Sequence, residues 1–251
     1  TEIGKEIMRR CADQVKAISI ELGGHAPFLG FADYGAEKAA ALACKSKFRN
    51  AGQSCVSATR FYVHQDIYDD FVDAAVAGAR EIKLGNGLDE GVTMGPLAEP
   101  NHLAKTLRLI DDARAKGARI LTGGRRAPQF TRGYFVEPTV MVNVTPDMDL
   151  MLEEPFCPIM PIMPFKTTDE ALALANASEY GLASYVATND LRTAIRCAEE
   201  LEAGIVAIND FSPATVLSPF GGIKQSGIGR EGGREGILEY MESKAISLSL
   251  E

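Results

Sequence analysis

Apolar residues recur along the chain in two alternating patterns. Helical spacing occurs in residues 2–14, 67–82 and 103–113, and in two segments that begin near Asp169 and at Asp190. In the last of these segments the residues expected to face inward are Leu191, Ala194, Ile195, Ala198 and Leu201. Runs typical of strands occupy residues 15–21, 61–64, 134–142, 159–165, 183–187 and 205–209. Because strands alternate with helices, the pattern predicts an α/β fold with a mostly parallel sheet flanked by helices.

The two ends of the chain have patterns of their own. Residues 1–23 form a predicted helix–strand unit with no strand before it, which is typical of a unit that continues upstream. Residues 240–250 alternate like a strand. An edge strand of this kind is usually covered, often by another subunit, so we expect a homo-oligomer, a dimer or a tetramer.

Composition and charge narrow the class of protein. The chain has 251 residues, 46% hydrophobic and 24% charged, and a net charge of −8 without a basic stripe, which disfavours nucleic acid as a partner. We expect no membrane association, because no apolar run reaches the roughly 18 residues of a membrane span. The five cysteines lack C-x-x-C spacing, which favours a reducing cytoplasm over a disulfide framework. Three isolated histidines predict no metal site.

Cys55 ends the segment FRNAGQSC, which is rich in small and polar residues. Such a segment suits a tight loop with exposed backbone N–H groups. A cysteine there becomes a useful nucleophile when it is partly exposed and held as a thiolate, for example by a helix N-terminus or nearby dipoles. On the cysteine alone, a buried structural thiol remains the commoner alternative.

Three further segments are weak signals singly. Glu21 begins ELGG at the end of a predicted strand, where open α/β sheets place their ligands. Residues 152–158 read LEEPFCP, a rigid loop or a plain connector. Residues 219–233 read PFGGIKQSGIGREGG, a glycine-rich stretch that matches neither a phosphate-binding loop nor a dinucleotide fingerprint in its context.

Taken in order, the four segments resemble the motifs of the aldehyde dehydrogenase superfamily: ELGG, GQxC some thirty residues later, EExFGP, and PFGGxKxSGxGRE. The match covers essentially the whole chain. The resemblance implies that Cys55 attacks an aldehyde, that the thiohemiacetal passes hydride to a nicotinamide (NAD or NADP), and that Glu21 activates the water that hydrolyses the thioester. It also implies an oxyanion donor, the backbone N–H of Cys55.

The same resemblance implies further roles. Glu154 and Phe156 would hold the nicotinamide ribose, and Leu22 and Gly23 would line the nicotinamide end. The chain departs from the pattern at Cys157, where the family has glycine. A side chain there crowds or tunes the loop, or offers a second oxidisable thiol, with a packed, inert cysteine as the commoner case.

Arg49, six residues before Cys55, resembles the arginine that binds the distal carboxylate in the succinate-semialdehyde dehydrogenase branch. That branch has a hydroxyl at the position of Ala214, so Ser212 or Thr215 would have to serve here. The resemblance therefore implies oxidation of succinate semialdehyde or a similar carboxylated semialdehyde, with 2-oxoglutarate semialdehyde, glutarate semialdehyde and plain aldehydes still open.

The resemblance divides the chain into a remnant of the nucleotide-binding domain (1–23), a catalytic domain (24–236) and an oligomerisation arm (237–251). Family members are about twice as long, so we expect the polypeptide alone to bind NAD poorly and to oxidise aldehydes poorly. Two alternatives stay open: an inert assembly module that retains the motifs, and a cofactor-independent thiol esterase built on Cys55 and Glu21.

Overall fold

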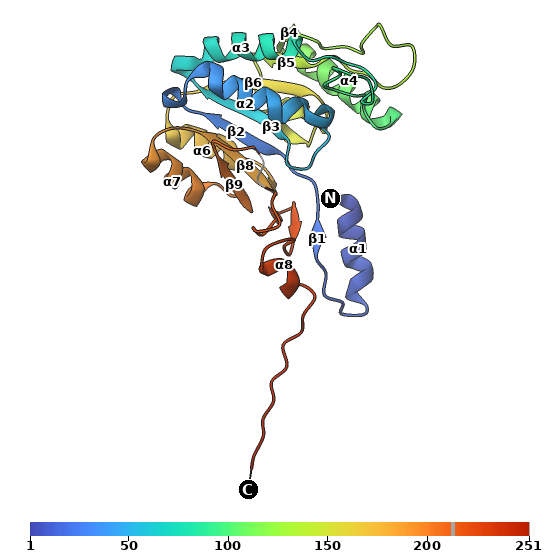
Figure 1. The fold of residues 1–251 in the computed structure, drawn as a ribbon, viewed down its shortest axis with the longest axis vertical. Coiled ribbons are helices and arrows are strands. Elements are labelled where there is room, and N and C mark those ends of the chain that lie inside the picture. Colours follow the sequence, from blue (N-terminus) through green and yellow to red (C-terminus); the bar gives the residue numbers. More distant parts are fainter. Residues whose placement is uncertain (212–213, 251) are drawn as a thin grey trace.

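A seven-stranded sheet forms the centre of the computed structural model, which describes residues 1–211 and 214–250. All neighbouring strands are parallel except the antiparallel pair β4–β5 at one edge. The order across the sheet is β4 (Arg119–Thr122), β5 (Thr139–Val142), β6 (Ile159–Phe165), β3 (Ala58–His64), β2 (Ala26–Gly30), β8 (Ala183–Ala187) and β9 (Ile205–Ile208). The predicted α/β class with a mostly parallel sheet is confirmed (Figure 1).

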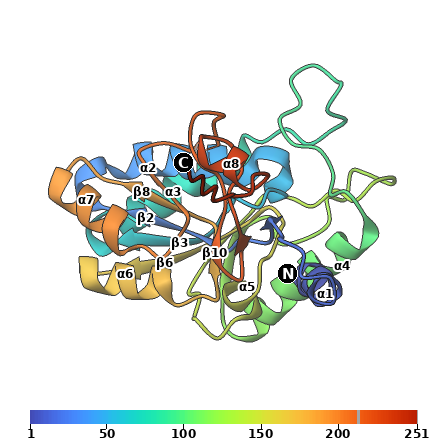
Figure 2. The ribbon, with the colours of Figure 1, turned by 90° about the horizontal axis from the view of Figure 1, so that it is seen from below.

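Helices cover both faces of this sheet (Figures 1 and 2). The helices α2 (Ala36–Phe48) and α3 (Tyr68–Arg80) pack together on one face, and α6 (Thr168–Asn176) and α7 (Leu191–Glu200) lie on the other. Two of these helices begin at side-chain caps, because Thr167 accepts from the N–H of Glu170 and Asp190 from that of Thr193. The sheet is apolar on both faces, as expected for parallel strands covered by helices.

The remaining elements connect and flank the sheet. They are α4 (Pro100–Ala115), α5 (Asp149–Leu152), α8 (Glu235–Leu238), the short strands β7 (Tyr180–Gly181) and β10 (Ile223–Lys224), which pair with each other, and the 3-10 turns Ala32–Tyr34, Arg49–Gly52 and Gln65–Ile67.

The N-terminal segment lies beside the C-terminal one, outside the central sheet (Figure 1). Helix α1 (Glu2–Ala12) leads to β1 (Ile20–Glu21), which pairs antiparallel with β11 (Gly227–Ile228). This pairing joins residues about two hundred positions apart and fixes Glu21 on a strand that belongs to neither edge of the main sheet. The tail beyond α8 runs away from the rest of the chain.

Several predicted elements differ from those observed. The strand expected over residues 15–21 is reduced to Ile20–Glu21, because only these residues find a partner strand. The strand expected over 134–142 begins only at Thr139. Strand β2 and helix α2 were not predicted. In the segment of α7, Ala194 and Leu201 are buried as predicted, whereas Leu191 and Ile195 are 71% and 50% exposed and Ala198 is exposed as well. Cys197 provides a buried contact that was not predicted.

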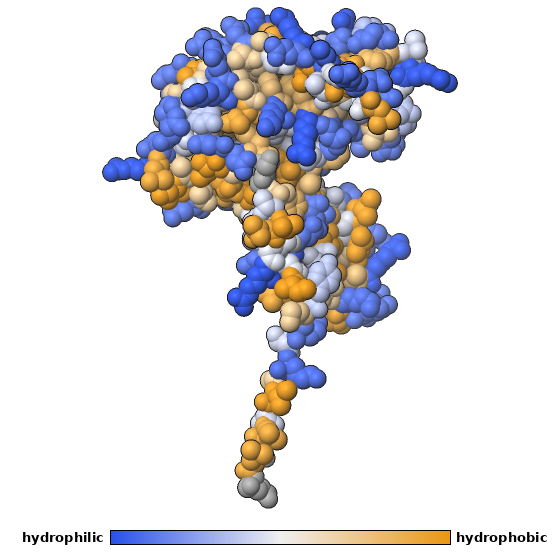
Figure 3. Space-filling model, in the orientation of Figure 1, coloured by the Kyte–Doolittle hydropathy of each residue, from blue (hydrophilic) through white to orange (hydrophobic). Residues whose placement is uncertain are grey.

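The predicted C-terminal strand is also absent from the described residues. Residues 242–250 are extended and exposed, because no second strand lies beside them, and their apolar side chains Ile246, Leu248 and Leu250 are each at least 76% exposed. Figure 3 shows this tail as a hydrophobic strip projecting from the molecule. Over the part of the chain that is described, no helix is long and apolar enough to cross a membrane.

Candidate active site

The motifs meet at the amino ends of three neighbouring parallel strands. Gly24 lies just before β2, Cys55 just before β3 and Glu154 a few residues before β6. Because β2 pairs with β3 and β3 with β6, these segments share one edge of the sheet. The sequence predicted a site at the carboxyl end of a strand. Glu21 does lie at the carboxyl end of the short strand β1, but in the main sheet the site lies at the amino ends of the strands.

The loop that carries Cys55 has an unusual backbone. Asn50 and Ala51 both adopt the left-handed conformation, with φ of 51° and 54°. Asn50 Nδ2 donates to the carbonyl of Gln53 (2.8 Å), Gln53 Nε2 donates back to the carbonyl of Asn50 (3.1 Å), and Gln53 Oε1 accepts from the N–H of Ala98 (2.8 Å). These bonds hold the loop in one shape, which stabilises the strained residues.

Cys55 is half-buried, and its thiol lies close enough to the Glu21 carboxyl group for each to shift the pKa of the other. Burial and the adjacent negative charge of Glu21 raise the pKa of Cys55 to about 12. The pKa of Glu21 is itself raised, mainly by partial burial. The arrangement is therefore a neutral thiol next to a carboxylate base, and not a thiolate held by a helix dipole as the sequence suggested.

The backbone around Cys55 is held from the opposite side of the pocket. Tyr185 on β8 donates its hydroxyl proton to the carbonyl of Val56 at 2.5 Å, and its ring stacks on Phe211 with centroids 4.5 Å apart. Within the described residues the N–H of Cys55 donates no hydrogen bond, so it is available to an oxygen in the site.

Glu154 points toward the glycines that follow Glu21. Its Oε1 accepts from the N–H of Gly24 at 3.0 Å, and a Cβ on Gly23 would lie only 2.7 Å from its Oε2. Burial raises the pKa of Glu154. Phe156 has a positive φ of 53° and its ring meets His102 edge-on at 5.8 Å. Leu22, half-buried, instead packs its side chain against Gly4 of α1.

Helix α4 holds the Glu154 loop, a role that the sequence reasoning missed. Lys105 donates to the main-chain carbonyl of Glu154, and Arg108 forms salt bridges with Asp149 and Glu153. No local motif marks Lys105 and Arg108, because the groups that they bind lie some 45 residues farther along the chain. The charges on the predicted helix were the feature of the sequence that pointed to them.

Behind the site lie two buried groups, Cys157 and Lys47. Cys157 is fully buried, and burial raises the pKa of its thiol, which favours the packed, inert interpretation. Lys47 is also fully buried, its Nζ has no hydrogen-bond partner among the described residues, and burial lowers its pKa to about 8. The charges of Cys157 and Glu154 oppose that shift. No sequence pattern marks Lys47 as a site residue.

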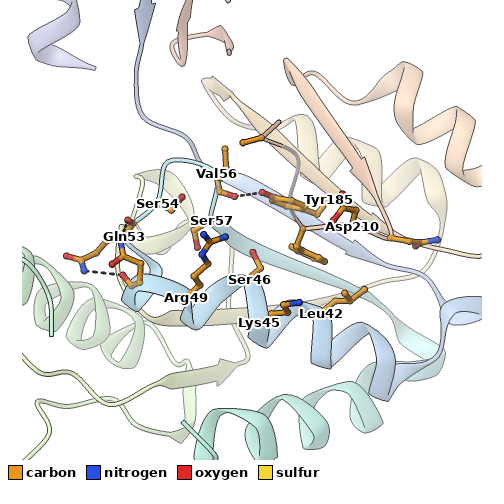
Figure 4. A pocket seen from close by; sticks show the side chains of 14 residues that line it. Leu42, Lys45, Ser46, Arg49, Gln53, Ser54, Val56, Ser57, Tyr185 and Asp210 are labelled. Carbon is orange, nitrogen blue, oxygen red and sulfur yellow. Dashed lines mark hydrogen bonds between the residues drawn. The ribbon is translucent and has the colours of Figure 1, made fainter. Parts of the chain in front are cut away.

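A pocket of about 490 Å³ opens at Ser54 and Val56, the residues that flank Cys55 (Figure 4). Its walls come from α2, the Cys55 loop, Tyr185 on β8 and the segment after β9, and it is lined by Leu42, Lys45, Ser46, Arg49, Asn50, Gln53, Ser54, Val56, Ser57, Tyr185, Asn209, Asp210, Phe211 and Ala214. Arg49 reaches from the end of α2 toward Ser57, next to the residues that flank Cys55.

Of the two hydroxyl residues predicted to serve in this pocket, Thr215 does not line it. Ser212 lies outside the described residues. Thr215 is exposed, its hydroxyl lies 3.1 Å from that of Ser218, and it is not among the lining residues, whereas Ala214 is. Among the described residues, no group of three or more His, Cys, Asp or Glu side chains is arranged to hold a metal.

We expect Gly24→Ala to damage the site without unfolding the chain. A Cβ at Gly24 would lie 2.4 Å from the carbonyl oxygen of Cys55, so the Cys55 backbone must shift. A displacement of this size costs about 100-fold in the rate of aldehyde oxidation. Gly87→Ala, where a Cβ meets nothing within 4 Å, is the matched control and should leave the steady-state rate unchanged. Equal rates for the two variants would contradict this geometry.

Known proteins match this chain along its whole length. The aldehyde dehydrogenase family profile matches residues 1–246. The chain is 46% identical to 3-sulfolactaldehyde dehydrogenase of Pseudomonas putida over 99% of this chain and 51% of that protein. It is 44% identical to glutarate-semialdehyde dehydrogenase of Pseudomonas putida (100% and 51%) and to NADP-dependent succinate-semialdehyde dehydrogenase of Escherichia coli (100% and 52%). The chain therefore spans about half the length of these relatives.

Solved structures agree with the sequence matches. Betaine aldehyde dehydrogenase of Staphylococcus aureus in complex with NAD⁺ superposes with a TM-score of 0.94 at 42% identity, over 97% of this chain and 49% of that one. Succinate-semialdehyde dehydrogenase of Burkholderia pseudomallei gives a TM-score of 0.92 at 43% identity, over 95% and 49%. With three of the four motifs meeting at one edge of the sheet, these matches show that the chain belongs to the aldehyde dehydrogenase family.

Proposed function

We propose that the protein oxidises an aldehyde that carries a distal carboxylate, succinate semialdehyde or a close analogue, to the carboxylic acid, with NAD or NADP as cofactor. The observation that carries the proposal is the proximity of the Glu21 carboxyl group to the Cys55 thiol, beside a pocket that Arg49 lines together with Ser54 and Val56, the neighbours of Cys55. This pairing favours a catalytic thiol over an inert module that retains the motifs. The names of the semialdehyde dehydrogenases among the relatives support the substrate class.

The residues around Glu154 fit a nicotinamide nucleotide. The Gly24 N–H occupies Oε1 of Glu154, which leaves the lone pairs of Oε2 for hydroxyl donors, and the missing side chain at Gly23 keeps the space beside that oxygen open. Glu154 and Phe156 would hold the nicotinamide ribose, with Gly23 and Leu22 beside it. When bound, the cofactor supplies the hydride acceptor.

Glu21 and Cys55 perform the proton transfers. Because burial and the charge of Glu21 raise the pKa of the thiol, Cys55 is protonated at neutral pH, and Glu21 assists its attack on the carbonyl carbon by taking the thiol proton. The N–H of Cys55 is positioned to stabilise the oxygen that becomes negative. Once that proton has passed to solvent, the raised pKa of Glu21 suits the carboxylate to deprotonate the water that releases the acid.

Arg49 supplies the substrate selectivity in this proposal. Its guanidinium lies in the pocket near Ser57 and forms no salt bridge with the described carboxylates, so it is available to the carboxylate of a substrate. Two parallel N–H···O bonds from a guanidinium recognise a carboxylate strongly. An acidic protein can therefore bind an acidic aldehyde through one local positive group.

Replacing Arg49 with methionine tests this assignment. We expect the KM for succinate semialdehyde to rise about 10- to 100-fold, since a charged hydrogen-bond pair is lost, while kcat/KM for propanal stays within about twofold. Arg80→Met, which removes an exposed arginine from α3, is the matched control. A parallel loss with propanal would show that Arg49 supports the fold and not the acid group.

We further propose that residues 237–251 act as an arm that pairs with a second subunit, and that residues 1–23 belong with a nucleotide-binding domain. The exposed apolar side chains of the extended tail support the first point. All five cysteines are free, which supports a cytoplasmic location.

A further inference from the structure

The pocket beside Cys55 contains a second cation, Lys45. Leu42, Lys45, Ser46 and Arg49 all line the pocket, and their spacing of three and four residues puts them on one face of α2 and its C-terminal end. From Leu42 to Arg49 this face extends about 10 Å at the rise of a helix. The pocket therefore continues along α2 beyond Arg49, away from Cys55 (Figure 4).

The charges of the two walls differ. Lys45 is exposed and, among the described residues, forms a salt bridge with none of the carboxylates, as is also true of Arg49. Across the pocket, Asp210 lies beside Tyr185, and its negative charge contributes to the raised pKa of that tyrosine. A carboxylate in the pocket is thus attracted to the α2 wall and repelled by the opposite one.

The positions of the two cations along α2 determine which of them a substrate carboxylate contacts, according to the length of the substrate. Arg49 reaches toward the residues that flank Cys55, whereas Lys45 lies four residues, roughly 6 Å at the rise of a helix, farther along the wall. With the aldehyde carbon at Cys55, the carboxylate of a short semialdehyde meets Arg49 alone. Each added methylene moves the carboxylate along the wall, toward a position between Arg49 and Lys45.

We propose, on the basis of the function above, that Lys45 is a specificity residue that binds the distal carboxylate of semialdehydes longer than succinate semialdehyde. The preferred substrates are then five- and six-carbon ω-semialdehydes, whose carboxylate contacts Lys45 and Arg49 together. Leu42 and Phe211 offer apolar surface to the additional methylenes.

The test compares the wild-type protein with Lys45→Met on succinate, glutarate and adipate semialdehydes and on hexanal. We expect kcat/KM to fall about tenfold for the five- and six-carbon acids, the size of one hydrogen bond to a charged group, and less than about twofold for succinate semialdehyde and hexanal. Lys45→Arg, which keeps the positive charge, should retain the wild-type preference for the five- and six-carbon acids. Lys38→Met, on the same helix but outside this pocket, is the matched control.

Calorimetric titration with the dicarboxylates succinate, glutarate and adipate gives a readout that needs no turnover. Lys45→Met should weaken adipate binding about tenfold and leave succinate binding nearly unchanged. If Lys45→Met leaves the ratios of kcat/KM between the semialdehydes and the ratios of affinity between the dicarboxylates unchanged, the role of Lys45 is overturned while the proposed oxidation stands. A wild-type protein that oxidises none of the aldehydes would contradict the proposed function, and the titration would still decide whether Lys45 binds the longer acid.

Discussion

Replacing Cys55 with alanine is expected to abolish aldehyde oxidation, with a fall in kcat of at least about ten-thousand-fold. The reason is that the covalent step requires a nucleophile at this position, and loss of a nucleophile from a catalytic group that acts as a unit removes most of the rate. The measurement is the steady-state formation of reduced cofactor with succinate semialdehyde.

The control for this variant is another thiol. Cys11→Ala removes a partly exposed cysteine from α1 and should retain full activity. Both variants should keep the unfolding midpoint of the parent, since Cys55 lies in a half-exposed turn and not in the packed core. Substantial oxidation by Cys55→Ala would show that a different residue is the nucleophile.

The second large effect is expected at Glu21. Glu21→Gln keeps the size of the side chain but removes the base that accepts the thiol proton and activates water, so kcat should fall about 100- to 10,000-fold. The Glu231→Gln variant is the control, because the negative charge of Glu231 contributes only a minor part of the rise in the pKa of Glu21. Similar losses in both variants would indicate a general charge effect instead of base catalysis.

The pH profile separates the same two explanations. Glu21 is active as the carboxylate, and its pKa is raised by burial, so kcat/KM should fall with decreasing pH through a value above the ordinary range of a glutamate. In Glu21→Gln this acidic limb should vanish from the residual activity. An unchanged limb in the variant would assign the titration to another group.

The fold class followed from the sequence because most elements carry their own pattern. Helix α2 was not predicted because its sequence, AEKAAALACKSKF, buries three alanines and a lysine among its six buried residues and shows little contrast between its faces. Strand β2 is short and contains proline and glycine. Strand β1 exists only through its pairing with β11, two hundred residues away, so a local pattern overestimated its length.

The site was predictable as a set of motifs but not as a geometry. The segments around Glu21, Cys55 and Glu154 are separated in sequence, and the sheet register brings them to one edge. The protonation of Cys55 depends on burial and on the Glu21 contact, which no spacing encodes. Lys47 and Lys105 were missed for the same reason: each acts on a segment that only the fold brings near.

The most direct test of the central claim is to trap the covalent intermediate. Glu21→Gln is mixed with excess succinate semialdehyde and cofactor, and intact-mass spectrometry with peptide mapping follows the product. Because attack and oxidation still proceed slowly in this variant while hydrolysis is impaired, we expect an acyl adduct on the peptide that contains Cys55 and none in Cys55→Ala. An adduct on another cysteine, or turnover with no adduct in either variant, would contradict it.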